Sequence, residues 1–308
     1  MRCTFCQNWV LSQWPKDVLP KSLDDVGNLR ASRRARPQLT ALANAIVGEH
    51  VTPKEIVRQA LATGCRSIAY TYTEPTIFYE LAYDTAVLAR EKGLKNVFVT
   101  NGFISEAPLR ELATVLDAAN VDLKFFRPES YRKISRARLE PVLAAIRLYR
   151  ELGVWVEVTT LVIPGVNDSD EELRGIATFL RSLGADLPWH VSLFYPAYRM
   201  MDRPPTPLAT LRRAAEIGRE AGLRHVYEGN VPGGEGEDTH CHACKALLVA
   251  RSPFGVLWNR IANDRCPDCS ERVDGVGMSA VVSSTQPIGP VEGTPSSRSA
   301  SSRRTSDR

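Results

Sequence analysis

The chain has 308 residues, of which 44% are hydrophobic and 24% charged, a composition that suits one sizeable α/β domain with a small additional module. It contains no apolar run of the length that a membrane-spanning helix needs, and it does not begin with the basic and then apolar pattern of a signal peptide. The net charge is +4, and residues 281–308 hold four arginines against one glutamate and one aspartate, so the remainder is close to neutral. This balance argues against a broad nucleic-acid surface on the core.

The first eight residues contain Cys3-Thr4-Phe5-Cys6, in which an aromatic side chain lies between two cysteines. A lone Cys-x-x-Cys is a weak signal, because zinc sites, redox pairs and iron–sulfur loops all use it. Residues 241–244 and 266–269 form two more such pairs, so six of the seven cysteines are paired in this way. This usage indicates metal ligands in a reducing cytoplasm rather than a disulfide framework.

Residues 10–50 predict an irregular connection, because Pro15, Pro20 and Pro37 interrupt any regular pattern. Four arginines within residues 30–36 form a basic cluster. The cluster could contact RNA or an acidic partner, but charge runs are more often solvated surface, so no function is assigned to it.

From Thr52 onward, helical and strand patterns alternate. Thr52 is placed as the N-cap of the first helix and Gly64 as its stop. We expect helices at 53–64, 77–92, 108–117, 139–153, 170–184 and 208–222, and strands at 67–71, 96–100, 120–123, 154–160, 189–194 and 225–227. This alternation predicts βαβ units with parallel strands, and therefore an α/β barrel or partial barrel.

Polar residues follow several of these strands, and in parallel barrels the chemistry collects at the C-terminal strand ends. Glu74 could accept a ligand amino group, or it could only complement the dipole of a helix that begins at Pro75. Asn101 could hydrogen-bond a ribose or a carboxylate, or it could belong to an ordinary Asn-Gly turn. Asp122 and Lys124 share one face of their strand, so Lys124 could neutralise an anion at the barrel mouth or form a surface ion pair.

Four further residues near strand ends have less specific interpretations. His190 lies on the strand at 189–194, where a histidine is more often structural, although a radical or proton role near a substrate is an alternative. Asn230 and the glycines at 233–234 follow the last strand and are expected to line the mouth.

The stronger metal signal is the set Cys241, Cys244, Cys266 and Cys269, whose two pairs are 21 residues apart, one more than the usual spacing of a four-cysteine zinc site. Four thiolates close a tetrahedron, which favours a structural zinc ion in a ribbon-like knuckle. An auxiliary iron–sulfur cluster and an iron site are alternatives, because tetrahedral sulfur does not discriminate between these metals.

The composition changes after Met278 to serine, threonine, proline, glycine and arginine, which predicts a disordered tail. The expected organisation is a partial barrel at 1–230 that includes the irregular connection at 10–50, a metal knuckle at 231–276 and the tail at 277–308.

Several separate blocks of the chain resemble radical S-adenosylmethionine (SAM) enzymes. The segment Cys3-Thr4-Phe5-Cys6, followed by Gln-Asn-Trp, resembles the end of the signature Cys-x3-Cys-x-aromatic-Cys of that family. A narrower resemblance is to the radical SAM component of the AmmeMemoRadiSam system, which is related to pyruvate formate-lyase activating enzymes. It is carried by the blocks Arg2–Trp9, Tyr70–Thr76, Asn96–Gly102, Trp155–Asn167 and Gly229–Gly236, and it extends over roughly residues 1–276.

The resemblance implies the partial TIM-type barrel of radical SAM enzymes, with a 4Fe-4S cluster and SAM as cofactors. In the family three cysteines bind three irons, and SAM chelates the fourth. Cys3 and Cys6 would be two of these ligands, and the remaining cysteine would fall two residues before Met1. Met1 is therefore interpreted as an internal methionine of a longer protein that also contains the first strand, and the chain as given could be inactive.

The same resemblance implies residues that bind SAM. Thr73 and Glu74 occupy the place of the Gly-Gly-Glu-Pro motif of related activating enzymes, and Asn101 and Lys124 are expected to contact polar groups of SAM. Phe5 and the loop Leu161–Asp168 are expected to border the adenine. No catalytic residue is assigned.

The implied reaction is cleavage of SAM to a 5′-deoxyadenosyl radical that abstracts hydrogen from an unknown small molecule or protein, with an electron donor such as ferredoxin or flavodoxin. The system name implies Memo-like and AMMECR-like proteins as partners. A second hypothesis is an activase that installs a glycyl radical on a protein. A third is a non-enzymatic module in which Cys3 and Cys6 bind zinc.

Overall fold

The computed structural model describes residues 1–12, 50–231, 235–252 and 255–279. The basic cluster at 30–36, the glycines at 233–234 and the tail beyond residue 279 lie outside the described residues, so the expectations for them stay predictions. Among the helices of the described part, none combines the length and the apolar character that a membrane crossing requires.

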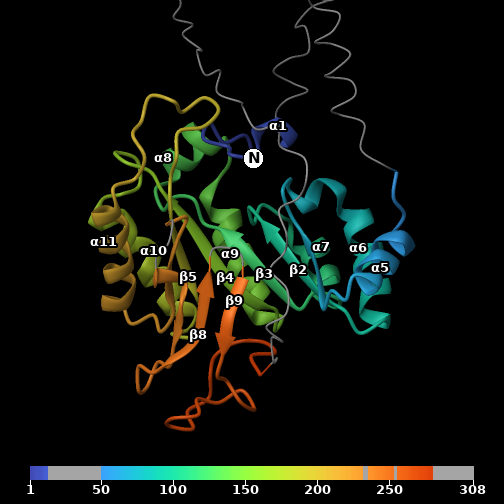
Figure 1. The fold of residues 1–308 in the computed structure, drawn as a ribbon. Coiled ribbons are helices and arrows are strands. Elements are labelled where there is room, and N and C mark those ends of the chain that lie inside the picture. The colour runs from blue at the N-terminus through green and yellow to red at the C-terminus, as the bar shows by residue number, and fades with distance from the viewer. Residues whose placement is uncertain (13–49, 232–234, 253–254, 280–308) are drawn as a thin grey trace, which may run out of the picture.

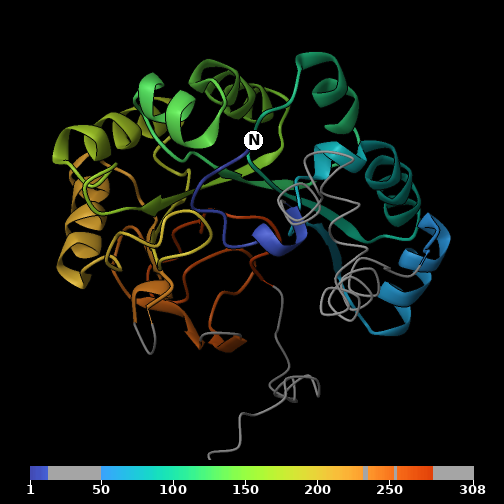
Figure 2. The ribbon, with the colours of Figure 1, turned by 90° about the horizontal axis from the view of Figure 1, so that it is seen from above.

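Six parallel strands form one sheet in the order β1-β2-β3-β4-β5-β6. The strands are β1 (Ser67–Tyr70), β2 (Lys95–Thr100), β3 (Ala118–Asp122), β4 (Trp155–Val162), β5 (Trp189–Leu193) and β6 (Val226–Gly229). The sheet is curved, with helices on its convex side and the C-terminal segment on its concave side (Figures 1 and 2). The predicted α/β partial barrel is therefore confirmed, because each strand pairs with the next one along the chain.

One of the longer helices precedes β1 and the others connect consecutive strands, as the sequence pattern predicts. They are α5 (Pro53–Ala62), α6 (Tyr79–Glu91), α7 (Glu106–Leu112), α9 (Leu139–Glu151), α10 (Asp170–Leu183) and α11 (Leu208–Glu220). Helix α5 begins with a complete capping box, in which the Thr52 hydroxyl accepts from the N–H of Glu55 and the Glu55 carboxylate accepts from the N–H of Thr52. The N-cap that the sequence predicts at Thr52 is thus confirmed.

Two predicted helices begin at a different residue in the structure, and the other four end one or two residues earlier than predicted. The helix expected at 108–117 begins at Glu106 and ends at Leu112, since extended Ser105 provides the N-cap and Pro108 lies in the first turn, where its missing N–H costs no hydrogen bond. The helix expected at 77–92 is divided into a 3-10 turn η1 (Pro75–Phe78) and α6.

Burial alternates along the central strands, and this alternation decides which side chains face the concave side. In β4 the residues Val156, Val158, Thr160 and Val162 are buried, and the residues between them are half-buried. Of the half-buried residues, Thr159 and Leu161 line one cavity, and Trp155 and Glu157 line another. The strand period of two thus separates a helix-packed core from a concave face that is open to ligands.

Four short helical elements occur in addition to these strands and helices. They are α1 (Trp9–Ser12), α8 (Pro128–Ser130), a π-helix η2 (Tyr131–Ser135) and a 3-10 turn η3 (Glu235–Glu237). The sequence pattern predicted none of them.

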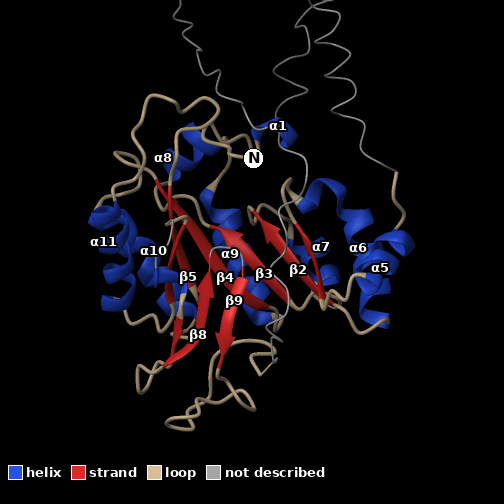
Figure 3. Ribbon diagram, viewed as in Figure 1, coloured by secondary structure: helices blue, strands red, loops and turns tan. Residues whose placement is uncertain are grey.

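The C-terminal segment forms a three-stranded antiparallel sheet that the sequence pattern did not predict (Figure 3). Its strands are β7 (Thr239–His240), β8 (Leu247–Ser252) and β9 (Gly255–Asn259). The segment has a small core of its own, which consists of Cys241, Leu248, Val249, Ile261, Cys266 and Val273. The domain boundaries expected at 230 and 276 stay predictions.

Candidate functional site

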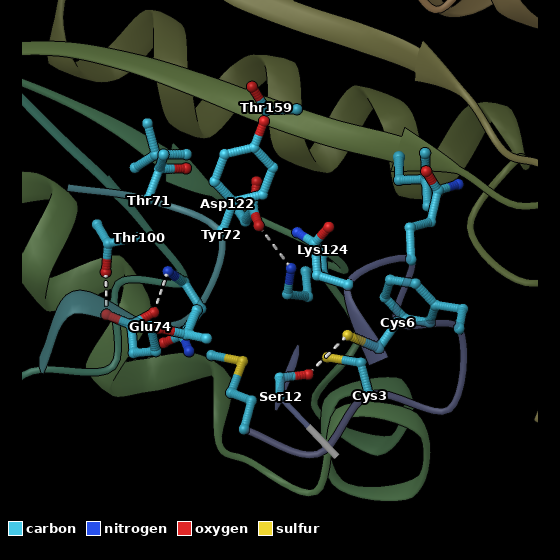
Figure 4. Close-up of a pocket in the computed structure, with 18 of the residues that line it drawn as sticks. Cys3, Cys6, Ser12, Thr71, Tyr72, Glu74, Thr100, Asp122, Lys124 and Thr159 are labelled. Atoms are coloured by element: carbon cyan, nitrogen blue, oxygen red, sulfur yellow. Dashed lines mark hydrogen bonds and ion pairs between the residues drawn. The ribbon is translucent and has the colours of Figure 1, made fainter. Parts of the chain in front are cut away.

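A pocket of about 390 Å³ lies where the N-terminal loop crosses the carboxyl ends of the parallel strands (Figure 4). The pocket brings the N-terminal cysteine pair together with the strand-end residues that the sequence predicts as candidates. Its lining consists of Met1, Cys3, Phe5, Cys6, Gln7, Asn8, Ser12, Thr71, Tyr72, Thr73, Glu74, Val99, Thr100, Asn101, Asp122, Lys124, Thr159, Leu161, Ser192 and Asn230.

Main-chain hydrogen bonds fix the cysteine loop to the π-helix η2. The N–H of Arg2 donates to the carbonyl of Ser135 at 2.9 Å, and the N–H of Thr4 donates to the carbonyl of Ile134 at 3.1 Å. Cys3 is buried between these two anchors, and its thiol donates to the hydroxyl of Ser135 at 3.4 Å. A π-helix leaves main-chain carbonyls outside the regular helical ladder and is often found at functional sites, and here its last turn holds the thiol in place.

The second thiol of the loop is held from the other side. Cys6 is half-buried, and its sulfur lies 3.2 Å from the hydroxyl of Ser12 at the end of α1. Helix α1 rests on the later part of the chain, since the ring of Trp9 stacks on that of Tyr198 at 5.6 Å. Both sulfurs are drawn on the same side of the pocket in Figure 4.

Phe5 packs inward beneath the cysteine loop. Its ring meets the ring of Phe125 edge-on at 5.9 Å, and Phe125 in turn meets Tyr131 of η2 at 5.7 Å. The ammonium of Lys124 lies 5.8 Å from the centre of the Phe5 ring, within the range of a cation–π contact. Phe5 therefore couples the loop to the end of β3.

Glu74 joins the ends of β1 and β2. Its carboxylate accepts from the hydroxyl of Thr100 at 2.6 Å and from the N–H of Asn101 at 2.7 Å. It also accepts from the N–H of Thr76 at 3.4 Å, which makes Glu74 the N-cap of η1. Both interpretations of Glu74 thus have a structural counterpart, because it caps a helical turn and also lines the pocket.

Asn101 and Gly102 form a tight turn at the end of β2. The side-chain oxygen of Asn101 accepts from the N–H of Phe103 at 2.9 Å, so Asn101 makes the ordinary turn contact that the sequence left as an alternative. Gly102 has a φ of 71°, and a Cβ added there would lie 2.7 Å from Cγ1 of Val121. Only glycine fits this position without displacement of the core.

Asp122 and Lys124 form an ion pair of 2.7 Å at the end of β3. Burial opposes the positive charge of Lys124, but the carboxylate of Asp122 and the nearby Cys3 outweigh this effect and raise the pKa of Lys124. Lys124 therefore carries its charge into the pocket, beside the cysteine loop.

Some residues that the sequence suggested lie away from this pocket. Of the loop Leu161–Asp168, Leu161 alone is part of the lining. Asn167 is fully buried. Its side-chain amide donates to the main-chain carbonyl of Lys124 at 2.8 Å and to that of Leu161 at 2.9 Å. The loop therefore braces the ends of β3 and β4. Cys65, the cysteine that belongs to none of the three Cys-x-x-Cys pairs, is exposed and is also outside the lining of this pocket.

His190 lines a second and larger cavity of about 980 Å³ on the concave face, nearer the N-terminal ends of the strands. Its Nε2 lies 2.7 Å from the carboxylate of Glu157, and its ring stacks on Tyr227 at 5.0 Å. Burial raises the pKa of Glu157, but the hydrogen bond with His190 and the one from the indole N–H of Trp155 outweigh it, so the pKa of Glu157 is lowered. Sequence reasoning singled out His190 but not Glu157, whose only signal was its place on the same strand face as Thr159.

The four C-terminal cysteines converge as the sequence predicted. Their sulfurs lie within 4.8 Å of one another, with 3.6 Å between those of Cys241 and Cys269 and 3.7 Å between those of Cys244 and Cys266. Burial raises the pKa of Cys241, but main-chain N–H groups of the turn that follows outweigh it and lower this pKa to about 7. This arrangement can hold one tetrahedral metal ion.

Comparison with known proteins gives a consistent result. Residues 1–177 match the radical SAM superfamily. An uncharacterized protein of Methanocaldococcus jannaschii is 42% identical over 276 residues, which cover 89% of this chain and 74% of that protein. The benzylsuccinate synthase activating enzyme of Thauera aromatica is 26% identical over 145 residues, which cover 45% of this chain and 44% of that enzyme.

A solved structure supports the fold. The crystal structure of Streptococcus suis SuiB bound to S-adenosylmethionine superposes with a TM-score of 0.50 and 16% identity, over 59% of this chain and 44% of that one. At this identity the likeness concerns the fold alone.

Proposed function

This chain belongs to the radical SAM superfamily, a superfamily of enzymes, and from that premise we propose that its pocket uses a 4Fe-4S cluster and SAM to start a radical reaction. The observation that supports the proposal most directly is the meeting of two free thiols with the strand-end residues Glu74, Asn101 and Lys124 in one pocket.

The thiols of the pocket fit two corners of such a cluster. Cys3 and Cys6 are both free and both line the pocket. Each lies within hydrogen-bond distance of a serine hydroxyl, Ser135 for Cys3 and Ser12 for Cys6, and a hydroxyl can donate to a thiolate that also binds iron. In the family motif the third thiolate would stand two residues before Met1.

The other wall of the pocket offers groups that suit SAM. Lys124 is positively charged and can pair with a carboxylate, while Phe5 supplies an apolar face beside it. Oε1 of Glu74 already accepts from Thr100 and from the N–H and hydroxyl of Thr76, whereas Oε2 accepts from the N–H of Asn101. A carboxylate oxygen has two lone pairs, so Oε2 can still accept from an amino group. Thr73 and Asn101 line the same wall.

A cluster held by Cys3 and Cys6 together with a third thiolate would supply the electron for reductive cleavage of SAM, and the resulting 5′-deoxyadenosyl radical would abstract hydrogen from the substrate. The protein's own part is to hold the reacting groups in a fixed geometry. The strand-end bonds of Glu74 and the ion pair of Asp122 and Lys124 provide this rigidity.

The test is anaerobic reconstitution followed by measurement of 5′-deoxyadenosine after reduction in the presence of SAM. We expect turnover from a chain that is extended before Met1 by Cys-Asn, which supplies the third thiolate of the motif, and little or none from residues 1–308 alone. In the extended chain, Cys3→Ser should abolish turnover, and the control Cys65→Ser should retain it because Cys65 is exposed and outside the pocket.

If neither chain binds a reducible cluster, the proposal fails. In that case zinc binding by Cys3 and Cys6 in a non-enzymatic module becomes the better explanation.

A second candidate function is activation of a glycyl-radical protein. The relatedness to the benzylsuccinate synthase activating enzyme favours it. A glycyl radical that forms on a partner protein only when the extended chain and SAM are both present, detected by electron paramagnetic resonance, would establish this function.

The partners are proposed from the sequence resemblance alone. We expect Memo-like and AMMECR-like proteins to act together with this chain, and ferredoxin or flavodoxin to supply the electron. Faster formation of 5′-deoxyadenosine with flavodoxin than with a non-physiological reductant would support the second expectation.

We also propose that the four-cysteine site holds zinc. In a tetrahedral zinc–thiolate site the sulfurs are roughly 3.8 Å apart, and the separations of 3.6 and 3.7 Å agree with this value. Zinc rather than iron in the purified protein would support the proposal, and iron at this site would contradict it.

A further inference from the structure

Two histidines and one aspartate meet at the junction of the barrel with the C-terminal segment. His225 directly precedes β6, His242 lies between the cysteines of the first pair, and Asp274 follows the second pair. One ring nitrogen of each histidine and a carboxylate oxygen of Asp274 all lie within 4.8 Å of one another. Nothing in the function proposed above uses these three residues.

We propose that His225, His242 and Asp274 form a second metal site, which binds a divalent transition ion such as zinc, separate from the four-cysteine site. The distances support one ion among the three groups. Nε2 of His225 lies 3.0 Å, and Nδ1 of His242 lies 3.8 Å, from Oδ2 of Asp274. These values bracket the separation of roughly 3.3 Å between ligands of a tetrahedral zinc ion.

The surroundings of His242 agree with this role. Metal-binding histidines usually donate the N–H of their second ring nitrogen to a carboxylate or carbonyl, which fixes the ring and its tautomer. Nδ1 of His242 faces Asp274, and its Nε2 lies 3.6 Å from the carboxylate of Glu271. Glu271 therefore stands where such an orienting partner is expected.

A hydrogen-bond network without an ion is the competing explanation. Arg224 lies 3.3 Å from both carboxylate oxygens of Asp274, so Asp274 already has a cationic neighbour. An arginine beside the carboxylate can also orient a metal ligand from the side. The two explanations differ in whether the chain binds an additional ion, and this difference can be measured.

The location of the proposed metal site indicates that its ion would be accessible from the second cavity. His225 is 5% exposed, and His225 and Asp274 both line the cavity of about 980 Å³ on the concave face. Three protein ligands leave at least one coordination position, and a site of that kind accepts water or an oxygen or nitrogen donor. The ion would thus lie in the wall of the large cavity, where it could bind a polar group of a cavity ligand.

The three ligands come from the barrel and from the C-terminal segment, so the ion would also link the two. His225 belongs to the barrel side, whereas His242 and Asp274 belong to the segment that carries the four cysteines. An ion bound by all three would fasten this segment to the barrel.

The experiment is metal counting on the cluster-free 308-residue chain. Zinc is added in excess, unbound metal is removed by gel filtration, and zinc per chain is measured by mass spectrometry. We expect Asp274→Asn and His225→Gln each to bind one equivalent less than the parent chain. The control His240→Gln should bind the same amount as the parent, because His240 is exposed, adjoins Cys241 and lies outside the cluster.

Cobalt substitution shows which site is lost. Cobalt in the four-cysteine site gives strong thiolate-to-metal charge-transfer bands, whereas cobalt bound by imidazole and carboxylate does not. We expect both variants to keep these bands at parental intensity, which also shows that the segment is folded. An unchanged zinc count in Asp274→Asn, or loss of the charge-transfer bands together with the equivalent, would overturn the second site.

Discussion

Cys3 and Ser135 are 132 positions apart in the sequence, yet the thiol of Cys3 donates a hydrogen bond of 3.4 Å to the hydroxyl of Ser135. Ser135 is the last residue of the π-helix η2 and is fully buried. The residue after it, Arg136, has a left-handed backbone with a φ of 52°, which ends the helix abruptly. The end of η2 thus positions a thiol of the candidate active site.

The first prediction concerns this contact. In the chain extended by Cys-Asn, Ser135→Ala should leave the fold intact but speed the loss of the reconstituted cluster by a few-fold, since a hydrogen bond contributes about 0.5–1.5 kcal/mol. The decay of the cluster's visible absorbance in air measures this effect. Ser182→Ala is the matched control, because its hydroxyl bonds a main-chain carbonyl of α10 far from the loop. Equal decay of both variants would contradict a positioning role for Ser135.

Glu74 carries the second prediction. Glu74→Gln keeps only one oxygen acceptor, so it cannot accept from both Thr100 and Asn101, and it removes the negative charge. Because a hydrogen bond to a charged group contributes about 1.5–3 kcal/mol, SAM should bind the reconstituted protein at least ten-fold more weakly. Isothermal titration calorimetry provides the measurement, with Glu80→Gln on the exposed side of α6 as control. If Glu74→Gln binds SAM as tightly as Glu80→Gln does, Glu74 has no part in binding.

Gly102 and Gly93 allow a prediction about stability. Both have positive φ values, 71° and 77°, so alanine is strained at either position. A Cβ at Gly102 would also lie 2.7 Å from Val121 and 3.1 Å from Val142, whereas nothing lies within 4 Å at Gly93. Gly93→Ala should cost about 1–2 kcal/mol for the left-handed backbone, and Gly102→Ala should cost about 1–3 kcal/mol more for overpacking. Urea unfolding measures the free energy of unfolding of both variants. Similar decreases in the two variants would mean that Val121 and Val142 can move aside for the added Cβ at little cost.

The extent to which the sequence predicted this molecule varies with the kind of signal. The alternation of helices and strands was visible because short runs rich in apolar and β-branched residues stand between longer helical patterns. The strand-end residues Glu74, Asn101 and Lys124 could be placed at one edge because parallel strands share their direction. All three line a single pocket, while their role in binding a cofactor stays a prediction.

Other features had no sequence signal. The residues of η2, Tyr131–Ser135, have neither the helical nor the strand period, and their importance comes from main-chain groups that contact Arg2 and Thr4. Contacts between main-chain groups that lie so far apart in the sequence cannot be predicted from a local pattern. The sheet of β7, β8 and β9 was also missed, because the cysteine pairs dominate that stretch and β9 is largely exposed. Glu157 could be identified only from the fold, which places its carboxylate 2.7 Å from Nε2 of His190.

The pair of Glu157 and His190 predicts a dependence of stability on pH. The folded-state pKa of Glu157 is lowered, so its contribution is complete above its ordinary value of 4.5 and is lost as the pH falls through the folded-state value. Glu157→Gln should therefore destabilise the protein at pH 7, and the difference from the parent should shrink below about pH 4.5. Thermal unfolding from pH 3.5 to 7 measures this difference. Glu140→Gln, at an exposed position on α9, should show none; a difference that is independent of pH would indicate a packing effect instead.

The four-cysteine site predicts a selective loss of structure when its ion is removed. The segment around it has a core separate from that of the barrel, and zinc contributes about 10–16 kcal/mol to the folding of small zinc domains near pH 7. Cys244→Ser, or treatment with a strong chelator, should therefore make residues 239–279 sensitive to protease while the barrel still unfolds cooperatively. Limited proteolysis with mass spectrometry locates the cuts, and Cys65→Ser serves as the control because Cys65 is exposed and outside the site. Cuts that appear equally in the barrel would show that the two cores depend on each other, and an unchanged pattern would show that the segment folds without its ion.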